Sequence, residues 1–502
     1  MKSGAGNLLF GVVLLLAGVA FSVASENVVW YGAIVVGLIN IVRGGMKLAR
    51  ASEGEPPARL AGEDVPAQVE VAAGAEGPKP SSPAETETAP VLDMKDLGRT
   101  AGWVLAFAIP AAFFFLLPPL TKSGLWDPYE LNVADLGRRL ALNLFHADAL
   151  SLSGADNSLP HLNDLGRPEL PFTSMALGFR LFGLHEWAGR LPLAIWGLAG
   201  ALATFGWVAR LVDRRAGIFA SVVLCTMPLF FVQARTMLGD VVTMSAISMA
   251  FGGLAVGAFG RGDTKAVDAG RVAWTVLGLV ALVAGYYSRG LMLGVGAPAV
   301  AIGLAWLATW GTGSRRLEPF GDVVGLVALI VGGWASAKGF LACSSTEVSN
   351  DLNMAAGAVL HAPQKYPTFD YFIGHLGPAA APWSAFVPLA MGRMFVAPVG
   401  RTGVANERES YARLAILVGG AVAFVAHGWL AARTDLIPFT APAVLAASCG
   451  IALRDYERGA KPSRALAVAT MVFLAVFHHD FHELPEKAYQ AFGVTGATFP
   501  ES

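Results

Sequence analysis

Charged residues are scarce in this chain, and their scarcity excludes an ordinary soluble protein. Asp, Glu, Lys and Arg make up 15% of the 502 residues, whereas hydrophobic residues make up 54%. Soluble domains carry about 25% charged residues, and the mean hydropathy of +0.54 is too high for a soluble chain of this length. The formal net charge is −1, so no basic field attracts nucleic acid, and we expect no nucleic-acid partner.

Cysteines and metal-binding motifs are also few. The three cysteines, Cys225, Cys343 and Cys449, lie in or at the ends of apolar segments and form no C-x-x-C motif, which argues against a disulfide framework or a zinc site. The run His478–His482 lacks a further ligand at metal-binding spacing. We therefore predict no metal site and no required cofactor, although a divalent metal is compatible with the sequence. No Walker A, H-E-x-x-H, G-x-S-x-G or Rossmann motif occurs in a suitable context, so nothing supports ATP hydrolysis.

Long apolar segments recur along the chain. Each has roughly the 17–25 residues needed to cross about 30 Å of hydrocarbon, and none alternates as a β-strand does, so we expect helices. The sequence predicts an all-α polytopic membrane protein with about eleven core transmembrane helices and a two-helix hairpin before them. The expected core spans are Ala101–Leu120, Glu186–Val212, Gly217–Gln233, Val241–Phe259, Val272–Tyr287, Leu291–Trp310, Gly321–Leu341, Ala380–Val396, Leu414–Ala432, Leu436–Leu453 and Ala465–Phe477.

Composition divides the chain into four parts. Residues 1–50 form the expected hairpin; the first apolar run also fits a signal peptide, but a second run follows almost at once and favours the hairpin. Residues 51–98 are rich in Pro, Glu and Ala, with few groups to bury, which predicts a disordered cytoplasmic linker. We expect the membrane domain at 99–485 and an exterior tail at 486–502.

The basic loops indicate the orientation. Alternate loops collect Arg and Lys, and the positive-inside rule makes their side cytoplasmic. The basic residues are Arg210, Arg214, Arg215, Arg261, Lys265, Arg271, Arg315, Arg316, Arg401, Arg408, Arg413, Arg454, Arg458, Lys461 and Arg464. The opposite side holds two long segments, Thr121–His185 and Cys343–Pro378, and loops of that length usually carry function. We expect an integral protein of a bacterial inner membrane with a periplasmic active face.

Two acids lie just past the first core span, in Trp126-Asp127-Pro128-Tyr129-Glu130. If Pro128 opens a helix, Asp127 is its N-cap and both acids lie at its first turn. This helix is amphipathic through Leu140 and is expected to lie flat at the membrane interface. Two interpretations stay open: Asp127 only caps the helix, or its carboxylate is held above the membrane as a general base.

Arginines mark three other exterior positions. Arg167 precedes Pro168 before an apolar helix, Arg235 and Asp240 flank a short turn, and Arg289 lies in a tight turn. A guanidinium at the headgroup level suits a phosphate. The other interpretation is that the arginines anchor helices in the interface and that Asp240 is an N-cap.

Taken together in this order, these motifs resemble the polyprenyl-phosphate-sugar glycosyltransferases of the C-type membrane superfamily. The nearest branches are the protein O-mannosyltransferases and the lipid A aminoarabinose transferases. The resemblance covers about Ala101 to Arg454. It includes the stretches Leu181–Pro192, Arg214–Phe230, Arg235 with Asp240, Arg289-Gly290, Pro382-Trp383-Ser384 and Pro438–Ala443.

The resemblance implies the roles of the site residues. Asp127 is expected to be the catalytic carboxylate, with Glu130 or Asp240 helping to orient it, and Arg167 and Arg289 are expected to contact the lipid phosphate. Two departures leave altered specificity or lost activity open. Pro128 and Tyr129 separate acids that are adjacent in many members, and Glu169 stands beside Arg167, where a carboxylate would repel a phosphate.

The expected reaction is transfer of one hexose or pentose from a polyprenyl-phosphate donor to an exterior lipid, glycan or protein acceptor. Two alternatives remain: a transporter or flippase of lipid-linked saccharides, and a noncatalytic member of the fold. Transporters often have internal repeats and charges near the bilayer midplane. This chain has no clear repeat, and its candidate polar residues lie at one membrane face, which favours the enzyme.

Overall fold

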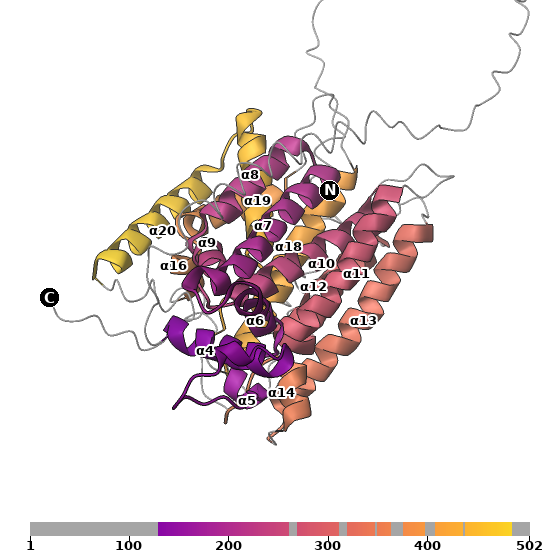
Figure 1. Cartoon of the computed structure of the whole chain (residues 1–502). Helices are drawn as coiled ribbons and strands as arrows, with labels where there is room; N and C mark the ends of the chain where they lie inside the picture. The colour runs from indigo at the N-terminus through magenta and orange to yellow at the C-terminus, as the bar shows by residue number, and fades with distance from the viewer. Residues whose placement is uncertain are drawn as a thin grey trace, which may run out of the picture.

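The described part of the chain is a bundle of helices (Figure 1). The computed structural model describes residues 129–260, 269–310, 319–346, 349–362, 375–396, 407–434 and 437–483, and these contain no β-strand. The all-α membrane class predicted from the sequence is confirmed. The hairpin, the linker, the tail 486–502, the Ala101–Leu120 span and Asp127 lie outside the described residues.

The helices follow one another in a simple order. They are α4 (Tyr129–Leu144), the 3-10 turn η1 (Asp148–Leu150), α5 (Leu162–Leu165), α6 (Leu170–Phe182), α7 (Glu186–Leu211), α8 (Arg214–Thr226), α9 (Pro228–Arg235), α10 (Asp240–Phe259), α11 (Ala269–Arg289), the π-helical η2 (Gly290–Gly296), α12 (Ala297–Trp310), α13 (Pro319–Ser344), α14 (Asn350–Ala356), α16 (Gly377–Ala379), α17 (Trp383–Met394), α18 (Glu407–Leu430), α19 (Pro442–Glu457) and α20 (Arg464–Glu483). In Figure 1, α4, α5 and α14 lie at one end of the bundle, and α20 and α13 lie at opposite edges.

Five helical segments of the described part are long and apolar enough to cross a membrane, or six if α8 and α9 form one bent span. The five are Glu186–Leu211, Asp240–Phe259, Ala269–Thr309, Pro319–Ser344 and Arg408–Leu430. The expected spans Ala380–Val396, Leu436–Leu453 and Ala465–Phe477 correspond to the shorter helices α17, α19 and α20. The integral membrane class therefore holds, and the expected count of about eleven core spans is not confirmed.

Helix α10 lies at the centre of the bundle. Of its most apolar window, 94% is buried, as expected for a helix that is apolar on every side. Small residues let its neighbours approach closely. A Cβ added at Gly200 of α7 would lie 2.4 Å from the Ser245 hydroxyl, and one at Gly253 would lie 2.6 Å from the backbone of Gly278 in α11. The position of Asp240, at the first turn of α10, is therefore set by tight packing.

The expected span Gly217–Gln233 corresponds to a bent pair of helices, α8 and α9. The chain bends by 65° between α8 and α9. Pro228 lacks a backbone N–H and starts α9 as its first residue, so the helix cannot run straight through it. Thr226 lies at the bend, where its hydroxyl donates to the Val222 carbonyl at 2.7 Å and accepts from the Trp383 indole at 2.9 Å.

The expected turn between α11 and α12 is present, although α11, η2 and α12 follow one another with no non-helical residue between them. Arg289 (φ −154°, ψ 28°) and Gly290 (φ +66°) leave the α-helical region. A Cβ added at Gly285 would lie only 2.2 Å from the Gly294 carbonyl oxygen. Residues nine apart in a straight helix are about 13 Å apart along its axis, so the chain reverses direction here, and the segment Ala269–Thr309, counted once above, crosses the bundle twice.

A buried ion cluster closes the other end of the bundle, where α8 begins and α19 ends. Arg454 donates to Asp213 at 2.7 Å and to Asp455 at 2.6 Å, and it also bonds Glu409. Asp455 in turn accepts from Arg413 at 2.7 Å. These residues join the start of α8, the start of α18 and the end of α19. Burial opposes the charged form of Asp213, but the Ala216 backbone N–H and the Arg454 guanidinium outweigh it and hold its pKa below the usual range.

Cysteine labelling tests the orientation. Ser153 and Ser463 are exposed at the two ends of the bundle, and Cys225, Cys343 and Cys449 are all buried, so the native background should be low. We expect an impermeant thiol reagent added outside intact cells to label Ser153→Cys and to miss Ser463→Cys. The reverse pattern would overturn both the orientation and the exterior position of Asp127.

Candidate functional site

The short turn between α9 and α10 is held from two sides by buried charges. On one side, Arg190 of α7 donates to both carboxylate oxygens of Glu130, from Nε at 2.7 Å and from Nη2 at 2.8 Å. Glu130 Oε1 also accepts from the Met237 backbone N–H at 2.8 Å. Glu130 is 0% exposed and Arg190 is 1% exposed. The first turn of α4 is therefore fastened to the turn that leads into α10.

On the other side, Asp240 lies between two arginines. Arg167 donates from Nη1 to Asp240 Oδ1 at 2.5 Å, and Arg289 donates from Nη2 to the same oxygen at 2.9 Å. Arg167 Nη2 also donates to the Leu238 carbonyl. All three charged residues are at most 7% exposed. The two guanidiniums thus converge on one carboxylate oxygen, and the three groups together carry a net charge of +1.

Local structure presents Arg167 to this turn. Gly166 ends α5 in the left-handed conformation (φ +68°), and Pro171 lies in the first turn of α6. The Arg167 guanidinium lies over the Phe172 ring, 5.2 Å from its centroid. A Cβ added at Gly239, where φ is +88°, would lie 2.9 Å from Arg167 Nη2. Glycine at this position therefore permits both the turn and the close approach of the guanidinium.

Helix α14 packs its backbone against the Arg289 turn. A Cβ added at Gly290 would lie 2.3 Å from the Met354 carbonyl oxygen, and one at Gly357 would lie 2.0 Å from the Arg289 carbonyl oxygen. Asn353 of α14 also donates to Asn163 of α5 at 3.5 Å. Since α5 ends just before Arg167, α14 contacts the segments that carry both arginines.

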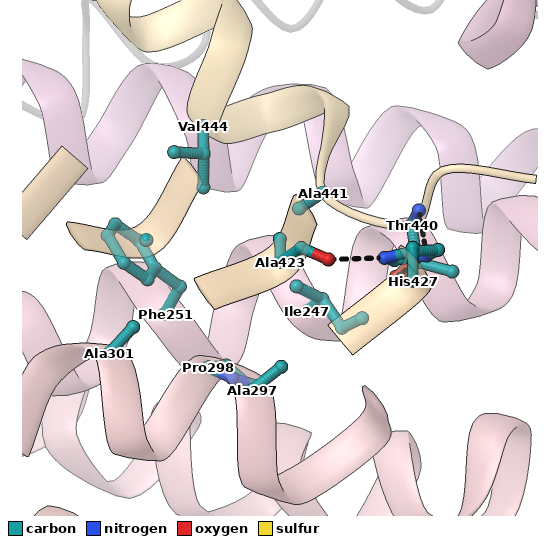
Figure 2. A pocket seen from close by; sticks show the side chains of 11 residues that line it. Ile247, Phe251, Ala297, Pro298, Ala301, Ala423, His427, Thr440, Ala441 and Val444 are labelled. Atoms are coloured by element: carbon teal, nitrogen blue, oxygen red, sulfur yellow. Dashed lines mark hydrogen bonds between the residues drawn. The ribbon is translucent and has the colours of Figure 1, made fainter. Parts of the chain in front are cut away.

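A small cavity lies deeper in the bundle, between α10, α12, α18 and α19 (Figure 2). Its only polar side chains are His427 and Thr440. His427 Nδ1 lies 2.7 Å from the Ala423 carbonyl, and His427 Nε2 accepts from the Thr440 backbone N–H at 3.2 Å. The two ring nitrogens are thus used within the protein, and the cavity offers mainly apolar walls. Ile247, in its wall, is seven residues or about 10 Å along α10 from Asp240.

The structure brings three of the five predicted site residues together. Arg167, Asp240 and Arg289 are in contact although Asp240 is 73 and 49 residues from its two partners in sequence. Glu130 is linked to this trio through the Met237–Leu238 backbone. Asp127 lies outside the described residues, three positions before Glu130. Glu169 is exposed whereas Arg167 is buried, so the expected repulsion next to Arg167 is reduced by solvent.

Arg190 is the main residue of this region that sequence reasoning missed. It is an ionisable residue in an apolar helix, and such residues are costly unless they have a partner. That cost was the signal available in the sequence. Its partner, Glu130, is 60 residues away, so only the fold identifies it.

Within the described ranges no group of three or more His, Cys, Asp or Glu residues is placed to hold a metal ion. His482, from the C-terminal histidine run, pairs instead with Glu483 at 3.3 Å.

Residues 167–334 match the family model of the dolichyl-phosphate-mannose-protein mannosyltransferases. The matched segment is about a third of the chain and contains Arg167, Arg190, Asp240 and Arg289. The resemblance to the C-type polyprenyl-phosphate-sugar glycosyltransferases is confirmed by this match. A comparison with curated proteins finds no match.

Solved structures of ArnT and of an oligosaccharyltransferase are similar in part. ArnT from Cupriavidus metallidurans in the apo state is 21% identical, with a TM-score of 0.49, over 72% of this chain and 61% of that one. ArnT bound to undecaprenyl phosphate is 19% identical, with a TM-score of 0.49, over 78% and 75%. The oligosaccharyltransferase AglB from Archaeoglobus fulgidus, with an inhibitory peptide and a dolichol-phosphate, is 13% identical, with a TM-score of 0.40, over 80% and 57%. The chain thus spans less than two thirds of the first and the last of these.

Proposed function

We propose that this protein is a membrane glycosyltransferase that moves one sugar from a polyprenyl-phosphate donor to an exterior acceptor. The observation that carries the proposal is the pair of buried guanidiniums, Arg167 and Arg289, that converge at the start of α10. They lie in the segment that matches a family of lipid-phosphate-sugar transferases. We infer an integral protein of a bacterial inner membrane, with this end of the bundle facing the periplasm.

The arginines suit a phosphate for a physical reason. A guanidinium offers several N–H groups in a plane that fits phosphate oxygens. Arg289 donates from Nη2 to Asp240, and Arg167 donates from Nη1 to Asp240 and from Nη2 to the Leu238 carbonyl, so both guanidiniums are held at the start of α10. The net positive charge of the trio then stabilises the charge that grows on the lipid phosphate as it leaves.

In the proposed reaction an acceptor hydroxyl attacks the anomeric carbon of the donor sugar. Its proton passes to the Asp127 carboxylate, the bond between the anomeric carbon and the phosphate oxygen breaks, and the electron pair departs with the polyprenyl phosphate. No nucleotide is needed, because the lipid phosphate is the leaving group. The acceptor is a lipid, a glycan or a protein.

Glu130 fits a positioning role better than a catalytic one. Both of its oxygens accept from Arg190, and one also accepts from the Met237 N–H. A carboxylate with these three bonds is poorly placed to receive a proton from an acceptor. We infer that Glu130 fixes the first turn of α4 against the turn before Asp240, three residues after Asp127 in the sequence.

The second candidate function is a flippase of lipid-linked saccharides, and the bend of 65° between α8 and α9 favours it, because transporters often bind substrates at broken helices. The charged trio, however, lies at one end of α10 rather than at its middle. Transfer of sugar to an acceptor by the purified protein would separate the two functions.

The experiment on the phosphate site uses Arg167→Ala and Arg289→Ala. Each variant leaves Asp240 one arginine, so we expect both to fold. Loss of a charge-assisted hydrogen bond costs about 1.5–3 kcal/mol, which lowers kcat/KM for the donor by roughly 10- to 150-fold. Donor turnover by protein reconstituted in lipid is the measurement.

Arg139→Ala is the matched control for these two variants. Arg139 lies on α4 at the same end of the bundle but pairs with the exposed Asp156 at 2.9 Å. We expect its donor kinetics to equal those of the wild type. Normal turnover in folded Arg167→Ala and Arg289→Ala would place the phosphate site elsewhere.

A further inference from the structure

We propose that Asp240 sets the charge of the candidate phosphate site so that the lipid phosphate product is released. The inference rests on the proposed function and deepens it. Asp240 would reduce the preference of the two arginines for a phosphate monoester, the product, over a phosphate diester, the donor. It is thus a specificity-determining residue rather than a base.

The geometry places the carboxylate where it can do this. One oxygen of Asp240 accepts from both Arg167 and Arg289, at 2.5 and 2.9 Å. Any phosphate held by the same two guanidiniums must lie close to that oxygen. Asp240 is only 5% exposed, so water screens its repulsion of the phosphate weakly.

Local structure keeps a negative charge at this position. Asp240 is the first residue of α10, where the helix dipole favours an anion. Its backbone N–H donates to Gln233 Oε1 at 3.1 Å. Gly239 has no Cβ, which leaves room for the Arg167 guanidinium. The local structure therefore fixes the carboxylate at this position in the site.

The reaction changes the charge of the ligand. The donor phosphate is a diester with one negative charge. When the bond to the sugar breaks, its electron pair stays on the phosphate, and the monoester product carries about −1.5 to −2 at pH 7. Coulomb attraction scales with charge, so two arginines without Asp240 would hold the product more tightly than the donor. Asp240 repels the product more than the donor and offsets this difference.

Two ligands that differ by one ester test the proposal. The probes are a polyprenyl phosphate and the methyl diester of the same lipid phosphate, bound to the full chain in lipid nanodiscs. We expect Asp240→Asn to raise the affinity ratio of monoester to diester on the order of tenfold at pH 7.5. Asp240→Glu keeps the charge, and we expect its ratio to stay close to that of the wild type. An unchanged ratio in Asp240→Asn would overturn the proposal.

The pH dependence gives a second readout that a purely structural role would not produce. The monoester loses its second proton near pH 6, and the diester does not titrate, so their ratio at each pH cancels those protein titration effects that act equally on both ligands. In the wild type we expect the ratio to change less than about threefold between pH 5.5 and 7.5, because Asp240 opposes the added charge. If the affinity ratio of the wild type rises tenfold or more over this pH range, the proposal is overturned, even if Asp240→Asn does not fold.

The outcomes separate this inference from the proposed function. If neither lipid binds the wild-type protein at a site sensitive to Arg167→Ala, the proposed function itself fails. If both lipids bind there and the affinity ratio of monoester to diester is the same in Asp240→Asn as in the wild type, only the proposed role of Asp240 fails.

Discussion

Replacing Asp127 with Asn is expected to lower sugar transfer by about 10²- to 10⁴-fold, the usual contribution of a general base. Asn has almost the size of Asp and caps a helix about as well, so α4 should still begin at the same place. The variant loses only the ability to accept the acceptor proton. Turnover of a polyprenyl-phosphate sugar is the measurement, together with the melting temperature, which we expect to change little.

Glu130→Gln is the matched comparison, because it makes the same chemical change three residues along the chain. Gln keeps an acceptor for the Met237 N–H but leaves the Arg190 guanidinium, only 1% exposed, without its carboxylate. Breaking a buried ion pair in this way costs about 3–5 kcal/mol. We therefore expect Glu130→Gln to lower the melting temperature clearly, unlike Asp127→Asn.

The two variants together decide which acid is the base. Full activity in Asp127→Asn would exclude Asp127. A severe loss of transfer in Glu130→Gln alone, at an unchanged melting temperature, would assign the base to Glu130. Loss of transfer and of stability together in Glu130→Gln agrees with a positioning role.

Replacing Arg454 with Met should destabilise the whole bundle. Arg454 is 0% exposed and bonds the carboxylates of Asp213, Glu409 and Asp455. Met preserves much of its volume but leaves these buried acids short of a cation, at a cost of about 3–5 kcal/mol or more. We expect a large fall in folded yield and in the melting temperature in detergent.

Arg215→Met is the control for the same change at the same end of the bundle. Arg215 pairs with Glu457 at 2.9 Å, but the two side chains are 63% and 41% exposed, and exposed pairs contribute about 0–1 kcal/mol. Equal stability of the two variants would show that the cluster does not hold α8, α18 and α19 together. Any Arg454→Met protein that folds should keep the donor KM, because α10 of 20 residues separates this cluster from Asp240 by about 30 Å.

The sequence by itself determined the membrane class and the set of candidate site residues. Apolar segments must be helical in lipid because each backbone N–H and C=O needs a partner within its own segment. The same local logic placed turns at Arg235–Asp240 and Arg289-Gly290, since polar residues between two apolar runs mark a span end. Pro228 was a readable sign of the bend between α8 and α9, because a proline inside an apolar run removes one backbone hydrogen bond and tends to kink or break a helix.

Only the tertiary structure decided which charges meet. The sequence offered Glu130 as a partner of Asp127 and offered Arg167 and Arg289 as two separate arginines. In the fold, Glu130 pairs with Arg190, which is 60 residues away, and both arginines share Asp240. Such contacts depend on how neighbouring helices rotate and how far they slide along each other. Periodicity within one helix shows which face is apolar, but the depth at which two helices pack is set by small residues such as Gly200 and Gly253 on both partners at once.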